Sequence, residues 1–185
     1  MNYTKKIFCL VLTGLLLLSA GCQKDKSSSQ PAETTAPAVE IKAEIGQEAA
    51  YGGMHMTLIS AEDPDITMDS GKSAIFFQVK IDNFTEETIA ANWLNNFSLT
   101  VDGTEYASDE CCTLPVMGKL YDFYGIDALN EEIPAGESRT GYIACEAEKG
   151  FQELSLHYTP KTTDRTSRIT VPVTAEQIVK AEKNS

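Results

Sequence analysis

Apolar and polar residues alternate most regularly between Ser73 and Phe84. In a β-strand, side chains two positions apart share a face. The alternation therefore gathers Ile75, Phe77, Val79 and Ile81 on one face and turns the polar residues between them to the other. A strand with one buried face needs neighbouring strands and a second layer to cover it. We therefore expect the domain to be built around this strand.

Shorter runs with the same alternation occur on both sides of it. They predict strands at residues 39–45, 54–59, 97–101, 104–107, 138–147, 151–158 and 168–173. Residues Asp102-Gly103 predict a hairpin, because they accept the positive φ angles of a type I′ turn. Seven or eight short strands with almost no helix predict an all-β fold, an antiparallel β-sandwich. The capping-box pattern from Thr174 to Gln177 predicts one short helix over residues 175–183.

The alternation is lost between Cys111 and Asn130, where we expect a long loop or irregular crossover. Residues 114–126 of this segment contain a group of apolar and aromatic side chains, Met117, Tyr121, Phe123 and Tyr124. Such a group is typical of a surface that binds a partner protein. It also suits a lid over an open end of the core. The lid is favoured, because soluble domains expose few apolar patches.

The N-terminus predicts export. Lys5 and Lys6 precede an apolar run, Ile7 to Leu18, that is shorter than the roughly 20 residues of a membrane-spanning helix. The run ends in Leu18-Ser19-Ala20-Gly21-Cys22, which resembles the lipobox of bacterial lipoproteins. The resemblance implies a signal peptide at residues 1–21, cleaved after Gly21, and a diacylglyceryl thioether on Cys22. Because two acyl chains give stable attachment, we expect a lipid anchor at the extracytoplasmic face of the cell membrane.

Two further segments follow the lipobox. Residues 22–38 are rich in Ser, Thr, Ala and Pro with almost no large apolar side chain, so we expect a disordered tether. Residues 39–185 then form a single domain of ordinary size. The formal net charge of the chain is −12. Nucleic acid is therefore not an expected partner, because phosphate binding depends on clustered Lys and Arg.

Three cysteines lie within the predicted domain, at Cys111, Cys112 and Cys145. Neighbouring cysteines rarely pair with each other, so Cys145 would bridge to Cys111 or Cys112 in an oxidising exterior. We take Cys112 and Cys145 as the candidate disulfide. The alternative is that Cys145 is a plain buried thiol.

No catalytic motif or metal site is expected. The chain has two histidines and no Ser-His-Asp arrangement, P-loop or HExxH motif, so we expect it not to be an enzyme. In a strand, Met54 and Met56 would point away from His55, which argues against a copper site. The acidic turn Asp63 to Asp69 lacks the glycine and the distant glutamate of a calcium loop. We expect no cofactor.

Several short motifs resemble one family. They are Phe77 to Asn83, the Asp102-Gly103 hairpin, and Ile133-Pro134-Ala135-Gly136-Glu137 followed by Thr140 to Ile143. Together they resemble domain of unknown function 4352, an immunoglobulin-like extracytoplasmic lipoprotein domain, over residues 40–173. The resemblance implies an immunoglobulin-like sandwich without catalytic residues. The cysteines at 111, 112 and 145 depart from the pattern of that family.

These observations predict a lipid-anchored extracytoplasmic domain with a non-catalytic role at the cell envelope, either binding a protein partner or structural. Its contact with the membrane would be through the lipid anchor. The alternative is an accessory lipoprotein that binds a small ligand or ion, using a cleft between the sheets and the acidic turn.

Overall fold

The computed structural model describes residues 39–160 and 167–183. The predicted signal peptide, the tether and the lipidation residue Cys22 therefore lie outside the described residues. Within the two described ranges, no helix combines the length and the apolarity needed to cross a membrane.

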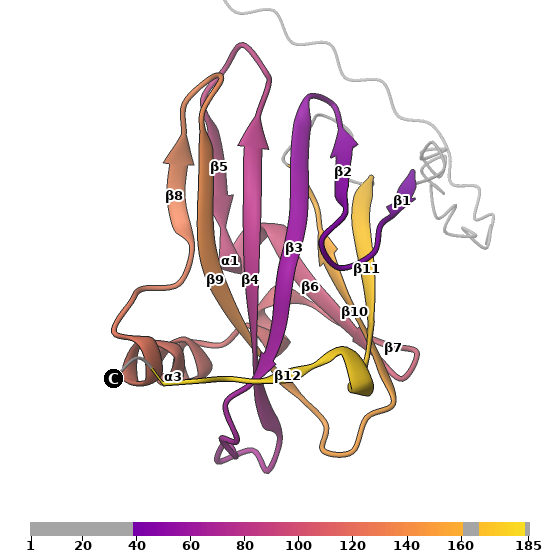
Figure 1. Cartoon of the computed structure of the whole chain (residues 1–185), viewed down its shortest axis with the longest axis vertical. Coiled ribbons are helices and arrows are strands. Elements are labelled where there is room, and N and C mark those ends of the chain that lie inside the picture. Colours follow the sequence, from indigo (N-terminus) through magenta and orange to yellow (C-terminus); the bar gives the residue numbers. More distant parts are fainter. Residues whose placement is uncertain (1–38, 161–166, 184–185) are drawn as a thin grey trace, which may run out of the picture. The chain divides into compact units, whose positions relative to one another are not determined.

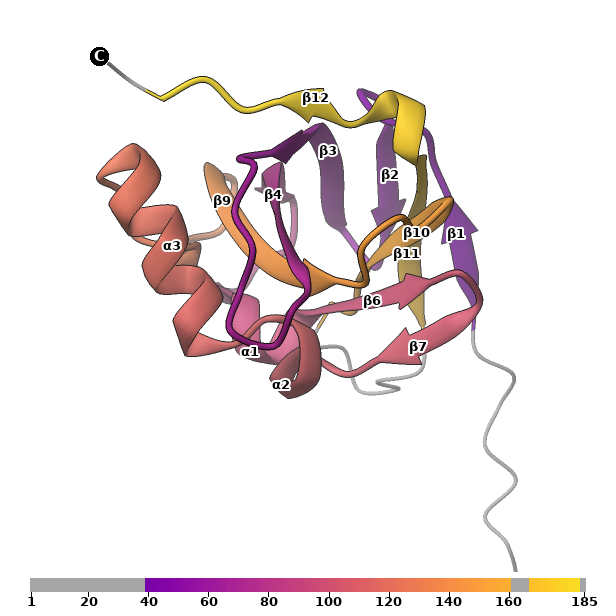
Figure 2. The ribbon, with the colours of Figure 1, turned by 90° about the horizontal axis from the view of Figure 1, so that it is seen from below.

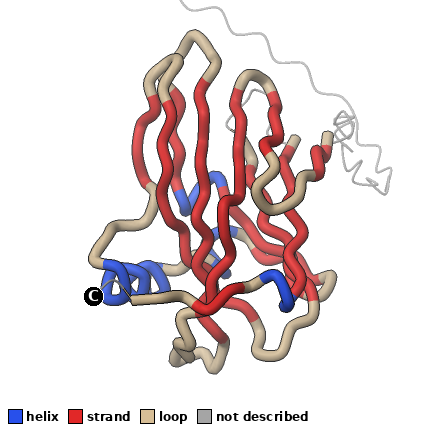
Figure 3. The backbone as a smooth tube through the Cα atoms, viewed as in Figure 1, coloured by secondary structure: helices blue, strands red, loops and turns tan. Residues whose placement is uncertain are grey.

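Two five-stranded, mainly antiparallel sheets and one two-stranded ribbon form the described domain (Figures 1 and 3). The first, here called the β4 sheet, has the order β12 (Val179–Lys180), β3 (Met54–Asp63), β4 (Ser73–Asn83) and β9 (Ser138–Ala147), with β2 (Glu48–Tyr51) also paired to β3. The second, the β10 sheet, has the order β1 (Glu40–Lys42), β11 (Arg168–Thr174), β10 (Glu153–Tyr158), β6 (Phe97–Val101) and β7 (Thr104–Tyr106). Only the pairs β1–β11 and β12–β3 are parallel among the described strands.

The architecture confirms the predicted all-β, immunoglobulin-like sandwich. The described residues contain more strands than the seven or eight expected, because β2, β12 and the ribbon of β5 (Ile89–Asn92) and β8 (Asn130–Ile133) are additional. These additional strands have only two to four residues, too short to show a clear alternation.

The central strand β4 has the predicted inner face. Ile75, Phe77, Val79 and Ile81 are each at most 2% exposed, and they belong to one buried cluster with apolar residues of the β10 sheet. The outer face differs from the expectation, because Phe76 is also fully buried there. A polar outer face was predicted from the strand alone, whereas a helix covers part of it.

The predicted hairpin is confirmed. Strands β6 and β7 pair through the register Val101 to Thr104, and the φ angles of Asp102 and Gly103 are 46° and 84°. The carboxylate of Asp102 also accepts hydrogen bonds from the backbone amides of Gln152 and Glu153 at 3.0 Å. The turn therefore also fixes the start of β10.

The segment from Cys111 to Asn130 is not the irregular crossover that we expected. It contains the helix α3 (Leu114–Tyr124), preceded by the short helices α1 (Trp93–Asn96) and α2 (Ser108–Cys111). A proline in its first turn and Gly125 in the left-handed conformation, with φ 72°, mark the ends of α3. The loss of strand periodicity in this segment therefore reflects a change from strand to helix.

The prediction of a C-terminal helix over residues 175–183 was wrong. The capping box between Thr174 and Gln177 is present, but it caps a single 3₁₀ turn over Ala175–Gln177. The chain then extends, because Val179 and Lys180 pair with Glu62 and Asp63 at the end of β3. This pairing satisfies backbone groups in place of a further helical turn.

Candidate interaction face

Helix α3 lies against the outer face of the β4 sheet, beside β9 and β4 (Figure 2). Val116, Met117 and Leu120 are buried on the inner side of the helix. Their spacing follows the period of a helix, and Phe123 and Tyr124 continue the same side at its end. This helical spacing was the signal in the sequence that could have revealed α3.

Two aromatic residues at the end of α3 close the core. The ring of Phe123 lies 5.7 Å from the ring of Phe76 between centroids, and the ring of Tyr124 lies 5.8 Å from it. The Tyr124 hydroxyl donates a hydrogen bond to the carboxylate of Glu62. Burial and this neighbouring carboxylate raise the pKa of Tyr124. Phe123 and Tyr124 therefore act as the core lid that was the favoured interpretation.

Met117 does not belong to a surface, since its side chain is 7% exposed. The predicted partner surface of Met117, Tyr121, Phe123 and Tyr124 is thus divided by the helix. Only Tyr121, 55% exposed, faces solvent in the way that a partner surface requires.

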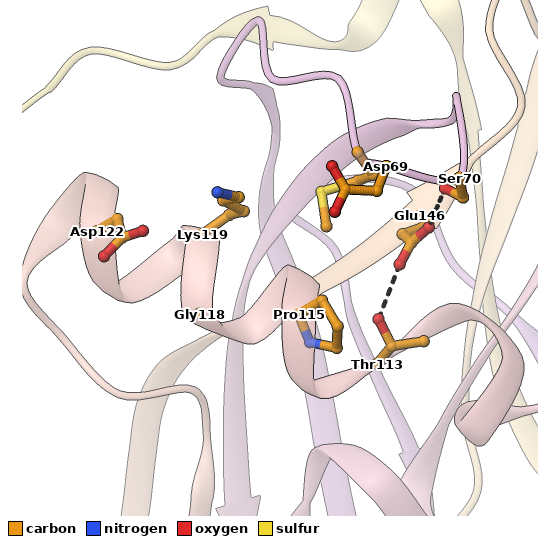
Figure 4. Close-up of a pocket in the computed structure, with 9 residues that line it drawn as sticks. Asp69, Ser70, Thr113, Pro115, Gly118, Lys119, Asp122 and Glu146 are labelled. Carbon is orange, nitrogen blue, oxygen red and sulfur yellow. Dashed lines mark hydrogen bonds between the residues drawn. The ribbon is translucent and has the colours of Figure 1, made fainter.

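The first turn of α3 is held by a buried carboxylate. Glu146, on β9 and 8% exposed, accepts hydrogen bonds from the Thr113 hydroxyl at 2.8 Å and from the Ser70 hydroxyl at 2.6 Å. Figure 4 shows it between the start of α3 and the loop that carries Asp69 and Ser70. Because helix N-termini favour negative charge, this position suits Glu146 electrostatically as well.

The outer side of α3 is apolar and open. Leu114 is 74% exposed and Tyr121 55%, and their separation of seven residues, about two turns, places both on one side of the helix. Gly118 lies between them on the same side, and a Cβ atom added there would meet nothing within 4 Å apart from the adjoining backbone of its own helix. The glycine is therefore not required by packing within the domain.

Two hollows flank this outer side. One, of about 680 Å³, is lined by Asp69, Ser70, Lys119, Asp122 and Glu146 among others (Figure 4). The other, of about 660 Å³, is lined by Trp93, Leu114, Tyr121, Asp127 and Glu131 among others. Gly118 lines both. Carboxylates outnumber cations in both linings, and Glu131 is paired with Arg139 at 3.1 Å.

We call the exposed side of Leu114, Gly118 and Tyr121, together with the two hollows, the α3 face. The acidic turn contributes only in part to it. Asp69 lines the first hollow, whereas Asp63 and Asp65 line a separate hollow near Lys180. The three carboxylates therefore do not converge on one point.

The three cysteines of the domain are brought together. The sulfur of Cys112 lies 2.8 Å from that of Cys145 and 3.6 Å from that of Cys111, and all three residues are buried free thiols in this structure. Hydrogen bonds from the other two thiols lower the pKa of Cys111, whereas burial raises the pKa of Cys145. The disulfide between Cys112 and Cys145 remains a prediction, and the fold places the pair adjacent.

The two histidines are on different sheets. His55 on β3 contacts Glu48 at 2.8 Å. His157 on β10 is 2% exposed and lies between the hydroxyls of Thr100 and Thr170 at 2.8 and 2.9 Å. Burial lowers the pKa of His157 to about 4. The imidazole is therefore neutral at ordinary pH and completes a hydrogen-bonded row within the β10 sheet.

No protein-family model matches this chain, and no curated protein sequence matches it. Among solved structures, it is similar to a candidate lipoprotein of Bacillus subtilis, ycdA, with a TM-score of 0.50 and 16% sequence identity. The match covers 70% of this chain and spans 38% of the Bacillus subtilis chain. At this identity the similarity shows the fold alone.

Two more solved structures resemble it. A candidate lipoprotein of Staphylococcus aureus has a TM-score of 0.48 and 12% identity, over 75% of this chain and 99% of that one. An uncharacterized β-sandwich protein of Clostridium difficile has a TM-score of 0.45 and 13% identity, over 75% of this chain and 97% of that one. These two matches and the Bacillus subtilis one are thus two candidate lipoproteins and one uncharacterized β-sandwich protein.

Proposed function

We propose that this chain is a lipid-anchored extracytoplasmic domain that binds a protein partner at the cell envelope through the α3 face, without catalysis. The anchor is Cys22, on the lipobox resemblance. The fold supplies a rigid sandwich, and α3 carries the binding surface.

The exposed stripe of Leu114, Gly118 and Tyr121 carries this proposal. A glycine inside a helix costs about 0.5–1 kcal/mol relative to alanine. No contact within the described domain needs Gly118 to lack a side chain. The missing side chain of Gly118 would let the backbone of a partner approach the helix closely between the two apolar side chains.

The charge around the stripe indicates the chemistry of the partner. Asp69 and Asp122 line one side, and Asp127 and Glu131 line the other. A segment with an apolar side chain flanked by Lys or Arg would complement this arrangement. Its binding would weaken as salt concentration rises.

The resemblance to domain of unknown function 4352 is part of the proposal, and contacts between its motifs support it. The amide of Gly136 donates to the carbonyl of Asn83 at 2.7 Å, and the Asn83 side chain donates to the carbonyl of Ile133 at 2.9 Å. The residue that ends β4 and the Pro134 to Gly136 turn thus form one structural unit.

Site-specific photocrosslinking in intact cells tests the proposed partner. The full lipoprotein would carry a photoreactive phenylalanine at Tyr121, which is 55% exposed, or at Phe84, which is 62% exposed, as the control. We expect a discrete protein adduct from position 121 only, lost when Leu114→Ser is added and kept with the control Val179→Ser. Each serine variant should change the free energy of unfolding by less than about 0.5 kcal/mol.

Identical adduct patterns from positions 121 and 84 would contradict the proposed binding role. The alternative, a small-ligand or ion-binding accessory lipoprotein, has its support in Asp69 and Glu146, which share the hollow of about 680 Å³. It would be favoured by a melting shift with Ca²⁺ or a metabolite that Leu114→Ser leaves unchanged.

A further inference from the structure

The three buried cysteines lie where the end of helix α2 meets strand β9. Cys111 ends helix α2, Cys112 follows as its C-cap residue, and Cys145 is on β9 opposite Ile75 of β4. Their exposed fractions are 1%, 0% and 0%. The cluster belongs neither to the α3 face nor to the hollows beside it, so its role is a separate question.

The sulfur positions are close to those of ligands around one ion. Three sulfurs held about 2.3 Å from a central ion in one plane would be about 4 Å from one another. In this structure the three sulfur atoms all lie within 4.8 Å of one another, with Cys111 to Cys112 at 3.6 Å and Cys112 to Cys145 at 2.8 Å. An opening of the second pair by roughly an ångström would admit the ion.

The ligand set selects the class of ion. Thiolates are soft ligands that favour Cu(I) and zinc over calcium, magnesium or manganese. Structural zinc sites are almost always four-coordinate. Among the described residues, the group contains the three cysteines and no fourth histidine, cysteine or carboxylate. Three sulfurs alone therefore suit Cu(I), for which no fourth ligand is needed.

The surroundings are also those of a closed site. The three cysteines belong to the same buried apolar cluster as Ile75 and Leu99, so they are shielded from water. Bound metal would displace the protons of these buried thiols, because thiolates are the form that coordinates metal.

We propose that Cys111, Cys112 and Cys145, when reduced, bind one Cu(I) ion through their sulfur atoms. Binding forms three copper–sulfur bonds and releases one proton to solvent for each thiol that ionises, with no change of oxidation state. The site is independent of the proposed function of the α3 face. It also competes with the predicted disulfide, because a bridge between Cys112 and Cys145 would remove two of the three ligands.

A competition titration tests this site. The full chain with Cys9→Ser and Cys22→Ser retains these three of its five cysteines. It would be purified in detergent, without oxygen and with a non-thiol reductant, and titrated with Cu(I) against a colorimetric Cu(I) chelator. We expect one tightly held Cu(I) per chain and an ultraviolet absorption band from thiolate-to-copper charge transfer.

Two variants separate the site from non-specific binding. Cys145→Ser leaves the adjacent pair but removes the third ligand, and it should weaken Cu(I) binding at least about 100-fold. Met117→Leu removes another buried sulfur outside the cluster and should leave binding unchanged. Circular dichroism would verify that both variants are folded. If Cys145→Ser misfolds, Cys111→Ser at the end of α2 provides the same comparison.

Several results would overturn the proposal. They are the absence of Cu(I) binding by the reduced chain, unchanged binding in folded Cys145→Ser, or tighter binding of Zn(II) than of Cu(I) in the same competition. Alkylation of intact cells before lysis gives a further test. A bridged Cys112 and Cys145 in that material would show that the ligands are not available in the cell.

Discussion

The two sides of α3 differ in burial and in the contacts that their side chains make. The inner side buries Val116 and Leu120 completely, and its last aromatic residues pack on Phe76. The outer side leaves Leu114 and Tyr121 in solvent and has a glycine between them. One helix of eleven residues therefore closes the sandwich and presents an apolar stripe at the same time.

The difference shows how a small β-sandwich can present an exposed apolar stripe without distorting its strands. The inner side is fixed by ring contacts and by the Glu146 carboxylate, so the outer side is presented on a rigid element. A rigid surface loses little conformational entropy when a partner binds. Mutations on the two sides should consequently affect different quantities.

The largest effect is expected from removal of the inner contact. Phe76→Ala deletes a fully buried ring that packs on Phe123 and Tyr124, and it should lower the free energy of unfolding by about 3–5 kcal/mol. Phe84→Ala at the other end of the strand, where the ring is 62% exposed, is the matched control and should cost less than about 1 kcal/mol. Urea denaturation measures both. Equal losses of unfolding free energy in the two variants would mean that the inner side does not anchor the helix.

A smaller effect is expected at the start of the helix. Glu146→Ala removes the acceptor of the Thr113 and Ser70 hydroxyls and should lower the free energy of unfolding by about 2 kcal/mol. Glu148→Ala removes a surface carboxylate, 58% exposed, that pairs with Lys72, so it should cost less than about 1 kcal/mol. Hydrogen exchange should show faster opening of the first turn of α3 in Glu146→Ala only. Unchanged exchange there would contradict the anchoring role.

The smallest expected change in the free energy of unfolding is an increase, at Gly118. Gly118→Ala should stabilise the free domain by about 0.5–1 kcal/mol, because alanine favours the helix and open space surrounds the position. The same change at Gly125, where φ is 72°, should destabilise the domain, because the left-handed conformation disfavours a side chain. Thermal unfolding measures both.

Crosslinking to the proposed partner tests the outer side of α3 further. Gly118→Ala should reduce the crosslinked adduct at position 121 although the domain is more stable. A more stable domain with an undiminished adduct would indicate that the glycine has no role in binding.

Some of this molecule could be predicted from local patterns. The inner face of β4 follows from alternation, and the β6–β7 turn follows from Asp102-Gly103, because both depend on residues next to each other in the chain. Helix α3 was missed although Val116, Leu120 and Phe123 have helical spacing. Exposed Leu114 and Tyr121 blur the amphipathic pattern, and Pro115 and Gly118 lower the helix propensity.

The alternation of apolar and polar residues was enough to predict the sandwich and its central strand, because a period of two can bury a face only in a β-strand. The packing of α3 on the β4 sheet makes Phe123 and Tyr124 core and Tyr121 surface, since this depends on which side of α3 meets Phe76. Tertiary structure likewise decided that Cys145 meets Cys111 and Cys112. That contact depends on packing between α2 and β9, which no local pattern of residues encodes.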